Sequence, residues 1–553
     1  MRIALLSVFA AAYAALSQPA PDEVIVVRDG RIVVAPGSEI EKGTVVVRRG
    51  LIDRVGPSDG IEIPAGARVV DASGMTVYAG FIDGHCKAGL PDTALKPEEV
   101  RLAEGQVPDY SKEALPRMEE ANRKGIRPQL MASDLTNVTE SVAKEWIGSG
   151  FTAANAAVGN EYFSGRGVLV SLSGAPRRSA IIPAHPFLHA GFRNAGENYP
   201  RTVMGTLAHI RQAFLDARRY REQHEHYLQN PTGTPRPPTD PALEALLEAL
   251  DGKVRVAFEA DSDPEIRRAL GLADEFGLKI AIAGAGEAYK AIEELRTANV
   301  PVILSLKWPK EPKELKKEDL EKFAAKPKKL IDEEKRLYED RITCAVALHK
   351  AGIPFALSTW ETKPSDALKN LGTLLKKGLP REAALSALTR APAELFGAAD
   401  RLGTLEAGKI ANLVVFTQPF GEKASKVRYA VVDGKLFDFD EKKKPTGPPT
   451  IDLTGRWTAT ARGPQGEVRF TIELEQKGAD LTGTLASPYG EAKVESGTVG
   501  GNSFEISARM GEQGKLTLRG ELKDDKIEGT ISLPGGIESE FSASKEPKKE
   551  SDR

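Results

Sequence analysis

Residues 254–284 have the sequence VRVAFEADSDPEIRRALGLADEFGLKIAIAG, in which two apolar runs flank an amphipathic stretch. The two runs, 254–260 and 278–284, are typical of strands with both faces buried, because few polar side chains interrupt them. Between the runs, Pro264 favours the first turn of a helix, and Asp263 is a candidate N-cap. This stretch therefore predicts a strand–helix–strand unit of parallel sheet.

The same alternation extends in both directions along the chain. Further apolar runs, VPVILSL (300–306) and IPFALST (353–359), are separated by helical stretches. Repeated strand–helix units over residues 81–397 predict an α/β domain, either a closed parallel barrel or a doubly wound sheet.

Short β-branched runs and turn pairs flank this domain on both sides. Asp29-Gly30 and Asp433-Gly434 are both two-residue hairpin signals. We expect residues 22–80 and 398–440 to form one composite β-sandwich domain. Residues 441–451, rich in lysine and proline, predict a linker. The alternating pattern of residues 452–545 predicts a small antiparallel β-barrel or sandwich.

The composition excludes several protein classes. The 553 residues are 41% hydrophobic and 28% charged, which is ordinary for globular domains and argues against disorder. The 76 lysines and arginines balance 78 acids, so the charge gives no reason to expect nucleic acid as a partner. The two cysteines, Cys86 and Cys344, cannot form a four-ligand zinc site, and we expect two free buried thiols rather than a disulfide.

The N-terminal segment has the pattern of a secretory signal. Arg2 precedes an apolar run that is too short to span a membrane, and small residues follow it. Residues 1–17 are therefore predicted to be a signal peptide, cleaved after Ala14 or after Ser17. The mature protein is expected to be periplasmic or extracellular, with no membrane span. The charged residues 546–553 are expected to be a disordered tail.

Three motifs, in this order along the chain, resemble the amidohydrolase superfamily. They are AGFIDGHCK (79–87), the α/β block, and ADRLGTLEAGKIANLVVF (399–416) followed by VVDGK (431–435). The imidazolonepropionase-like branch is the most similar. The resemblance implies that residues 81–397 form a (β/α)8 TIM barrel whose active site lies at the carboxyl ends of the strands. It also implies hydrolysis of carbon–nitrogen bonds with one or two divalent metals.

The metal site that the resemblance implies is incomplete in this sequence. The first barrel strand of the family ends in Asp-x-His-x-His, whereas this chain keeps His85 as a ligand and carries Lys87 at the second histidine position. Ala283, Ala285 and Ser305 stand where further ligands are expected. Trp360 stands at the position of the general-base aspartate, and an indole cannot accept a proton.

Other polar residues are weaker candidates for the site. Lys87, Glu259 and Asp261 are candidate catalytic residues. Glu259 and Asp261 follow a strand and share one face, so they could also bind a cation or form structural ion pairs with residues such as Lys87. Arg166, beside two glycines, is a candidate contact for an anionic ligand. The remaining histidines are poor ligand candidates: His224 and His226 lie on opposite faces of a predicted helix, His185 and His189 could chelate only if their segment were helical, and His209 and His349 fit amphipathic helices.

Two interpretations of function remain open at this stage. The first is an exported hydrolase acting on carbon–nitrogen bonds of a small molecule or peptide, with catalysis reduced or lost. The second is a non-catalytic protein that keeps the pocket as a ligand-binding or scaffold protein, as a homo-oligomer or with an active paralogue. The ligand count favours no bound metal over one divalent ion such as zinc.

Overall fold

The computed structural model describes residues 24–91, 125–192, 202–312, 328–439, 445, 447–463, 466–488, 490–509, 515–523, 526–532 and 538–545. The predicted signal peptide (1–17) and tail (546–553) lie outside these residues, as does part of the predicted linker (441–451). The chain divides into two compact units, with the boundary between Phe439 and Asp440. Each unit is described by itself below.

In the first unit, both flanks of the α/β region contribute strands to one hydrogen-bonded sheet of eight strands. Its order is β17-β16-β15-β5-β1-β2-β3, with β4 paired to β1. The first flank supplies β1 (Val24–Ala35), β2 (Ser38–Arg48), β3 (Leu51–Pro57), β4 (Arg68–Asp71) and β5 (Thr76–Ala79). The second supplies β15 (Leu413–Phe416), β16 (Val427–Val432) and β17 (Lys435–Asp438). The flanks meet where β15 runs antiparallel to β5.

The two Asp-Gly pairs of this sheet have different roles. Asp433-Gly434 forms the two-residue turn between β16 and β17, as predicted. The hairpin predicted at Asp29-Gly30 is wrong, because β1 continues through it and its register with β2 shifts on both sides of Gly30. Asp29 has φ 61°, so the pair produces a bulge within a long strand rather than a reversal of the chain.

The described residues of the α/β region between the flanks form two sheets. The larger has the order β14-β13-β12-β11-β10-β8, and the smaller has the order β6-β7-β9. The strands of the larger sheet are β8 (Phe163–Arg166), β10 (Leu188–Gly191), β11 (Val256–Ala260), β12 (Ile280–Gly284), β13 (Val302–Ser305) and β14 (Phe355–Ser358). Those of the smaller are β6 (Phe81–Cys86), β7 (Phe151–Ala156) and β9 (Val168–Ser171).

These two sheets differ from the predicted ring of eight parallel strands. Strands β10 to β14 pair in parallel, but β8 pairs antiparallel with β10, and β9 antiparallel with β7. Strand β6 packs against β14, and the side chain of Asp83 on β6 accepts a hydrogen bond from the backbone N–H of Thr359, just beyond β14. An apolar cluster within the region includes Ile82, Ala257 and Ile303 from three of these strands. The structure is therefore mixed α/β, with the ends of β6 and β14 adjacent.

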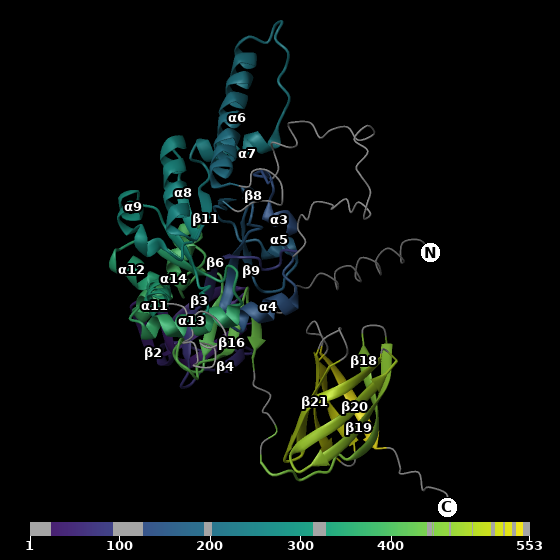
Figure 1. Cartoon of the computed structure of the whole chain (residues 1–553). Coiled ribbons are helices and arrows are strands. Elements are labelled where there is room, and N and C mark those ends of the chain that lie inside the picture. Colours follow the sequence, from purple (N-terminus) through teal and green to yellow (C-terminus); the bar gives the residue numbers. More distant parts are fainter. Residues whose placement is uncertain are drawn as a thin grey trace, which may run out of the picture. The chain divides into compact units, whose positions relative to one another are not determined.

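Helices cover the strands of the α/β region (Figure 1). They are α3 (Ala132–Leu135), α4 (Glu140–Ile147), α5 (Arg177–Ala180), α6 (Val203–Gln229), α7 (Pro241–Leu250), α8 (Asp263–Phe276), α9 (Ile292–Thr297), α11 (Lys328–Ile342), α12 (Cys344–Lys350), α13 (Pro364–Lys376), α14 (Arg381–Leu388) and α15 (Arg390–Leu395). Short 3₁₀ turns lie at Ser58–Gly60 and Ala288–Lys290. None of the helices in the described ranges has the length and apolar character needed to cross a bilayer.

Helix α8 follows β11 as the sequence predicts, but its cap is one residue earlier. Ser262 is the N-cap, and Asp263 is the first helical residue. The carboxylate of Glu265 accepts from the backbone N–H groups of Asp261 and Ser262, and so satisfies donors that the start of a helix leaves free.

The second unit is a closed antiparallel barrel of eight strands, visible in yellow-green in Figure 1. Its strands are β18 (Gly455–Gly463), β19 (Gly466–Lys477), β20 (Asp480–Ser487), β21 (Gly490–Gly500), β22 (Ser503–Arg509), β23 (Lys515–Lys523), β24 (Lys526–Ser532) and β25 (Glu538–Lys545). Trp457 is fully buried in its core, and its indole N–H donates to the carbonyl of Leu453. Of the two predicted forms, barrel or sandwich, the barrel is correct.

Candidate metal centre

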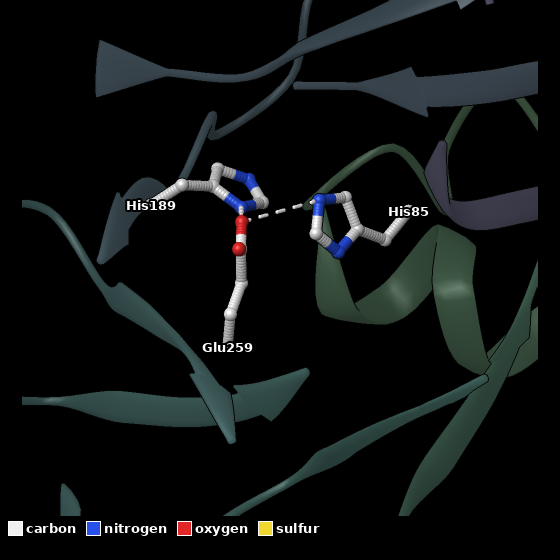
Figure 2. A group of neighbouring side chains, drawn as sticks. All are labelled: His85, His189 and Glu259. Atoms are coloured by element: carbon white, nitrogen blue, oxygen red, sulfur yellow. Dashed lines mark ion pairs between the residues drawn. The ribbon is translucent and has the colours of Figure 1, made fainter. Parts of the chain in front are cut away.

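Three strands bring His85, His189 and Glu259 together in the first unit. His85 lies on β6, His189 on β10 and Glu259 on β11, and one potential ligand atom from each lies within 4.8 Å of the other two. Figure 2 shows the carboxylate of Glu259 directed toward both imidazoles. Nε2 of His85 is 3.7 Å from Oε1 of Glu259, and Nδ1 of His189 is 3.9 Å from the same oxygen.

The two imidazoles are fully buried and neutral. Burial lowers the pKa of His85 well below its ordinary value, and the nearby His189 and Lys87 lower it further. Burial alone lowers the pKa of His189 to about 4. Within the described part of the chain, neither ring nitrogen of either histidine has a hydrogen-bond partner. Because buried polar atoms are nearly always hydrogen-bonded, these nitrogens are suited to bind a group from outside the described residues, such as a metal ion.

Glu259 is held in place by the loop after β7. The backbone N–H of Asn160 donates to its Oε2 at 2.8 Å, and the side chain of Glu259 is only 7% exposed. Asn160 has a φ of 62°, and Gly159 before it has a φ of 64°. A Cβ at Gly159 would lie 2.6 Å from Oε1 of Glu259 and 2.2 Å from the Trp360 ring, so only glycine fits here.

Trp360 covers His85. The two rings are stacked, with centroids 3.9 Å apart and planes at 12°, and Trp360 is 5% exposed. The backbone of Trp360 is also held, because Ser305 Oγ donates to its carbonyl at 2.7 Å. Lys87 is exposed, and its ammonium lies 5.3 Å from the indole centroid, a cation–π distance.

A cavity of about 270 Å³ lies beside this group. Its lining includes Glu259 and Trp360, together with Asp261, Ser305 and Lys307, but neither histidine. The cavity therefore adjoins Glu259 and Trp360, and neither histidine lines it.

Two other candidate residues, Asp261 and Arg166, form ion pairs outside the His85–His189–Glu259 group. Asp261 pairs with Arg341 of α11, and its Oδ1 accepts from the backbone N–H of Gly286 at 2.9 Å. The structural ion pair considered for Asp261 is thus present. Arg166 pairs with Glu248 of α7 rather than with any residue of the His85–His189–Glu259 group. Its contact with an anionic ligand stays a prediction.

Asp83 is buried and accepts four hydrogen bonds. The donors are the backbone N–H of His85 (3.2 Å), the backbone N–H of Thr359 (3.0 Å), the hydroxyl of Thr359, and the indole N–H of Trp146 on α4 (3.2 Å). Burial raises the pKa of Asp83 to about 6, against the opposing effect of these donors. With its oxygens occupied in this way, Asp83 holds the ends of β6 and β14 together.

Sequence reasoning missed His189. The sequence predicts chelation by His185 and His189 only if their segment is helical. The structure places His189 on a strand, within FLHAG (187–191). The available signal was this apolar run interrupted by a single histidine, which fits a buried strand. His185 lies in the preceding loop, and His209, His224 and His226 lie on α6, as the helical interpretation predicted. Both cysteines are free and buried, which confirms that prediction.

Short segments of the chain are similar in sequence to two known deaminases. A segment of 84 residues is 36% identical to a 5-methylthioadenosine/S-adenosylhomocysteine deaminase of Symbiobacterium thermophilum, and covers 15% of this chain and 19% of that protein. Another of 63 residues is 40% identical to an adenine deaminase of Rubrobacter xylanophilus, and covers 11% of this chain and 10% of that protein. The chain thus matches less than a fifth of either relative's length.

A solved structure extends the likeness over three quarters of the chain. The amidohydrolase from Thermotoga maritima MSB8 superposes with a TM-score of 0.58 at 24% identity, over 75% of this chain and all of that one, which shows a shared fold. The sequence model of the amidohydrolase family matches residues 76–437, more than half of the chain. The strands that carry His85, His189 and Glu259 lie within this match, and the chain belongs to the amidohydrolase family.

Proposed function

We propose that this protein is a hydrolase of carbon–nitrogen bonds in a small molecule, with one divalent metal ion, such as zinc, held by His85, His189 and Glu259. The observation that carries the proposal is the pair of fully buried imidazoles whose ring nitrogens have no hydrogen-bond partner in the described part of the chain, beside a carboxylate. Membership of the amidohydrolase family supports the reaction class.

The donor set fits a single divalent ion. Two neutral imidazoles and a carboxylate are a set that zinc uses in catalytic sites. The lowered pKa values keep both imidazoles unprotonated at neutral pH, which ligation requires. The two nitrogen–oxygen separations, 3.7 and 3.9 Å, are somewhat longer than the separation of about 3.4 Å between ligands of a tetrahedral ion with bonds near 2.1 Å. All three ligand atoms lie within 4.8 Å of one another, so binding would require the side chains to draw together.

When bound, such an ion lowers the pKa of water and polarises a carbonyl group. The chain supplies the position of the ligands: Asn160 fixes one oxygen of Glu259, and the stacked Trp360 fixes the ring of His85. It supplies no carboxylate at the general-base position, where Trp360 stands. We therefore expect slow hydrolysis, because a positioned acid or base contributes about 10²–10⁴ in rate.

The same substitution favours a second candidate function, a protein that binds a ligand without catalysis. Trp360 places an apolar ring at the base position, and the residue also lines the cavity. In this alternative the cavity would bind a small molecule or peptide, and hydrolysis of amides would stay at background even with a metal present.

Elemental analysis, followed by activity assays, tests the proposal. Protein purified without chelator is expected to contain about one zinc per chain. His85→Ala and His189→Ala should lose it, while His349→Ala, at an exposed histidine on α12, should keep it. Zinc-loaded protein should hydrolyse at least one member of a panel of amides, lactams and dipeptides faster than metal-depleted protein. Bound zinc without any such activity would favour the second function, and no bound zinc in any preparation would refute the metal centre.

We also propose export of the protein, on the basis of the sequence pattern in residues 1–17. N-terminal sequencing of the protein recovered from outside the cytoplasm should begin at Ala15 or Gln18. An N-terminus that retains Met1 in that fraction would contradict cleavage.

A further inference from the structure

Residues 159–163, in the loop after β7 and at the start of β8, contact two of the three strands that carry the proposed ligands. The backbone N–H of Asn160 donates to Oε2 of Glu259 on β11 at 2.8 Å. The carbonyl of Tyr162 accepts from the backbone N–H of Gly191 at 3.3 Å, at the end of β10, the strand of the second histidine. This segment therefore contacts one ligand directly and adjoins the strand of another.

The contact between Asn160 and Glu259 depends on an unusual backbone conformation. Asn160 has a φ of 62°, in the left-handed region, and the N–H is directed at the carboxylate in this conformation. Residues with a side chain adopt this region less readily than glycine, and neighbouring contacts have to hold them there. A contact made by the residue next to Asn160 can therefore decide where its N–H points.

An ion pair between Arg127 and Glu161 supplies such a contact. Nε of Arg127 donates to Oε2 of Glu161 at 2.9 Å, and Nη2 donates to Oε1, so both carboxylate oxygens are held. The side chains are only 25% and 16% exposed, so salt and water weaken this pair less than an exposed one. The backbone N–H of Arg127 is bonded separately, to the carbonyl of Phe163 at 2.8 Å. The guanidinium thus holds the residue next to Asn160 from an anchored position.

We infer that Arg127 is a positioning residue of the metal centre, which acts through Glu161 and Asn160 to fix the orientation of the Glu259 carboxylate. The inference rests on the proposed metal centre. A ligand that is already held in one orientation loses less freedom when it binds an ion, and the affinity is higher as a result. Groups that orient metal ligands typically contribute about 10–100-fold to metal affinity. We expect the lower end of this range, because Arg127 acts through two intermediate residues.

Zinc affinity, measured by competition with a chromophoric chelator, tests this role. Arg127→Met and Glu161→Met each remove the ion pair and keep a long side chain, and each is expected to bind zinc about tenfold more weakly than wild type. The double variant should lose no more than the more affected single variant, because the two residues act as one unit. Arg428→Met breaks a different ion pair, with Asp438 on β17, and should keep the wild-type affinity as the matched control.

The visible spectrum of cobalt-substituted protein separates positioning from a general loss of stability. Co²⁺ bound to Arg127→Met should have a changed spectrum, because the orientation of one of its ligands changes. A variant that is only less stable, but folded by circular dichroism, would bind the ion with the wild-type spectrum. Arg127→Lys keeps the positive charge, and its zinc affinity should lie between those of Arg127→Met and wild type.

The outcomes separate this inference from the proposed function. If zinc binds equally to wild type, Arg127→Met and Glu161→Met, or if the cobalt spectrum is unchanged, Arg127 has no positioning role and the metal centre is left intact. Losses that multiply to about a hundredfold in the double variant would also overturn the inference, since the two residues would then act separately. Failure of wild type to bind zinc refutes the metal centre and the inference together. Should Arg127→Met not fold, Glu161→Met alone decides.

Discussion

At the residue scale, the proposed chemistry depends on which side chain stands at position 360. The family resemblance implies a general-base aspartate at position 360, and this chain has a tryptophan there. We predict that Trp360→Asp in zinc-loaded protein raises kcat on any amide hydrolysed by wild type by about 10²-fold, the lower end of what a positioned base contributes. The pH–rate profile should gain an acidic limb. Trp360→Asn opens the same space without a base, so an equal rate increase in Trp360→Asn would contradict the role of the carboxylate.

The buried histidines also predict how stability depends on pH. The pKa of His189 falls from 6.5 to about 4 on folding, so the unfolded chain binds more protons between these values. Stability is then fully present above pH 6.5 and is lost as the pH falls toward 4, by up to about 1.4 kcal/mol per pH unit for this residue. His85 acts in the same direction. Asp83, with its pKa raised to about 6, opposes them by gaining stability as the pH falls below 6.

We therefore predict that metal-free His189→Gln loses less stability than wild type between pH 6.5 and 4.5. Urea unfolding followed by circular dichroism at 222 nm measures this, since the helices of the described residues all lie in the first unit. His349→Gln, at an exposed site, should keep the wild-type slope. Identical slopes for wild type and His189→Gln would show that His189 is not held neutral by burial.

At the scale of elements, Asp83 joins the edge strands of the two sheets. It connects β6 to the residues after β14 and, through Trp146, to α4. Asp83→Ala would leave buried donors without an acceptor, and we predict a loss of about 1–3 kcal/mol in the free energy of unfolding of the first unit. It should also weaken zinc binding, because β6 positions His85. Asp400→Ala, at an exposed aspartate, is the matched control, and equal stability of the two variants would contradict this role.

At the scale of the whole molecule, the two units have separate cores. Trp457 belongs to the core of the barrel, and the strands of the metal centre belong to the first unit. Trp457→Ala should destabilise the barrel by about 3–5 kcal/mol. We predict that it lowers only one of two calorimetric transitions and leaves zinc content unchanged. Glu491→Ala, on the barrel surface, should alter neither, and a loss of zinc from Trp457→Ala would show that the units are coupled.

Local patterns were enough to predict the classes of element. Continuous apolar runs predicted the buried strands, and helical periodicity predicted α6 and α8. The strict alternation of residues 452–545 predicted the β-strands of the second unit. These predictions succeeded because they depend on neighbours within a few residues. The hairpin at Asp29-Gly30 failed for the same reason: a turn pair and a bulge use the same left-handed conformation, and the partner strand decides between them.

The sequence by itself determined the α/β class, the contribution of both flanks to one β domain, and an antiparallel β-rich second unit, either a barrel or a sandwich; it also predicted His85 as a metal ligand. Only the tertiary structure decided that His189 and Glu259 join His85, while Asp261 turns to Arg341. These residues are far apart along the chain, on β6, β10 and β11. Their proximity comes from strand order and register, which depend on the packing of the whole sheet rather than on local sequence.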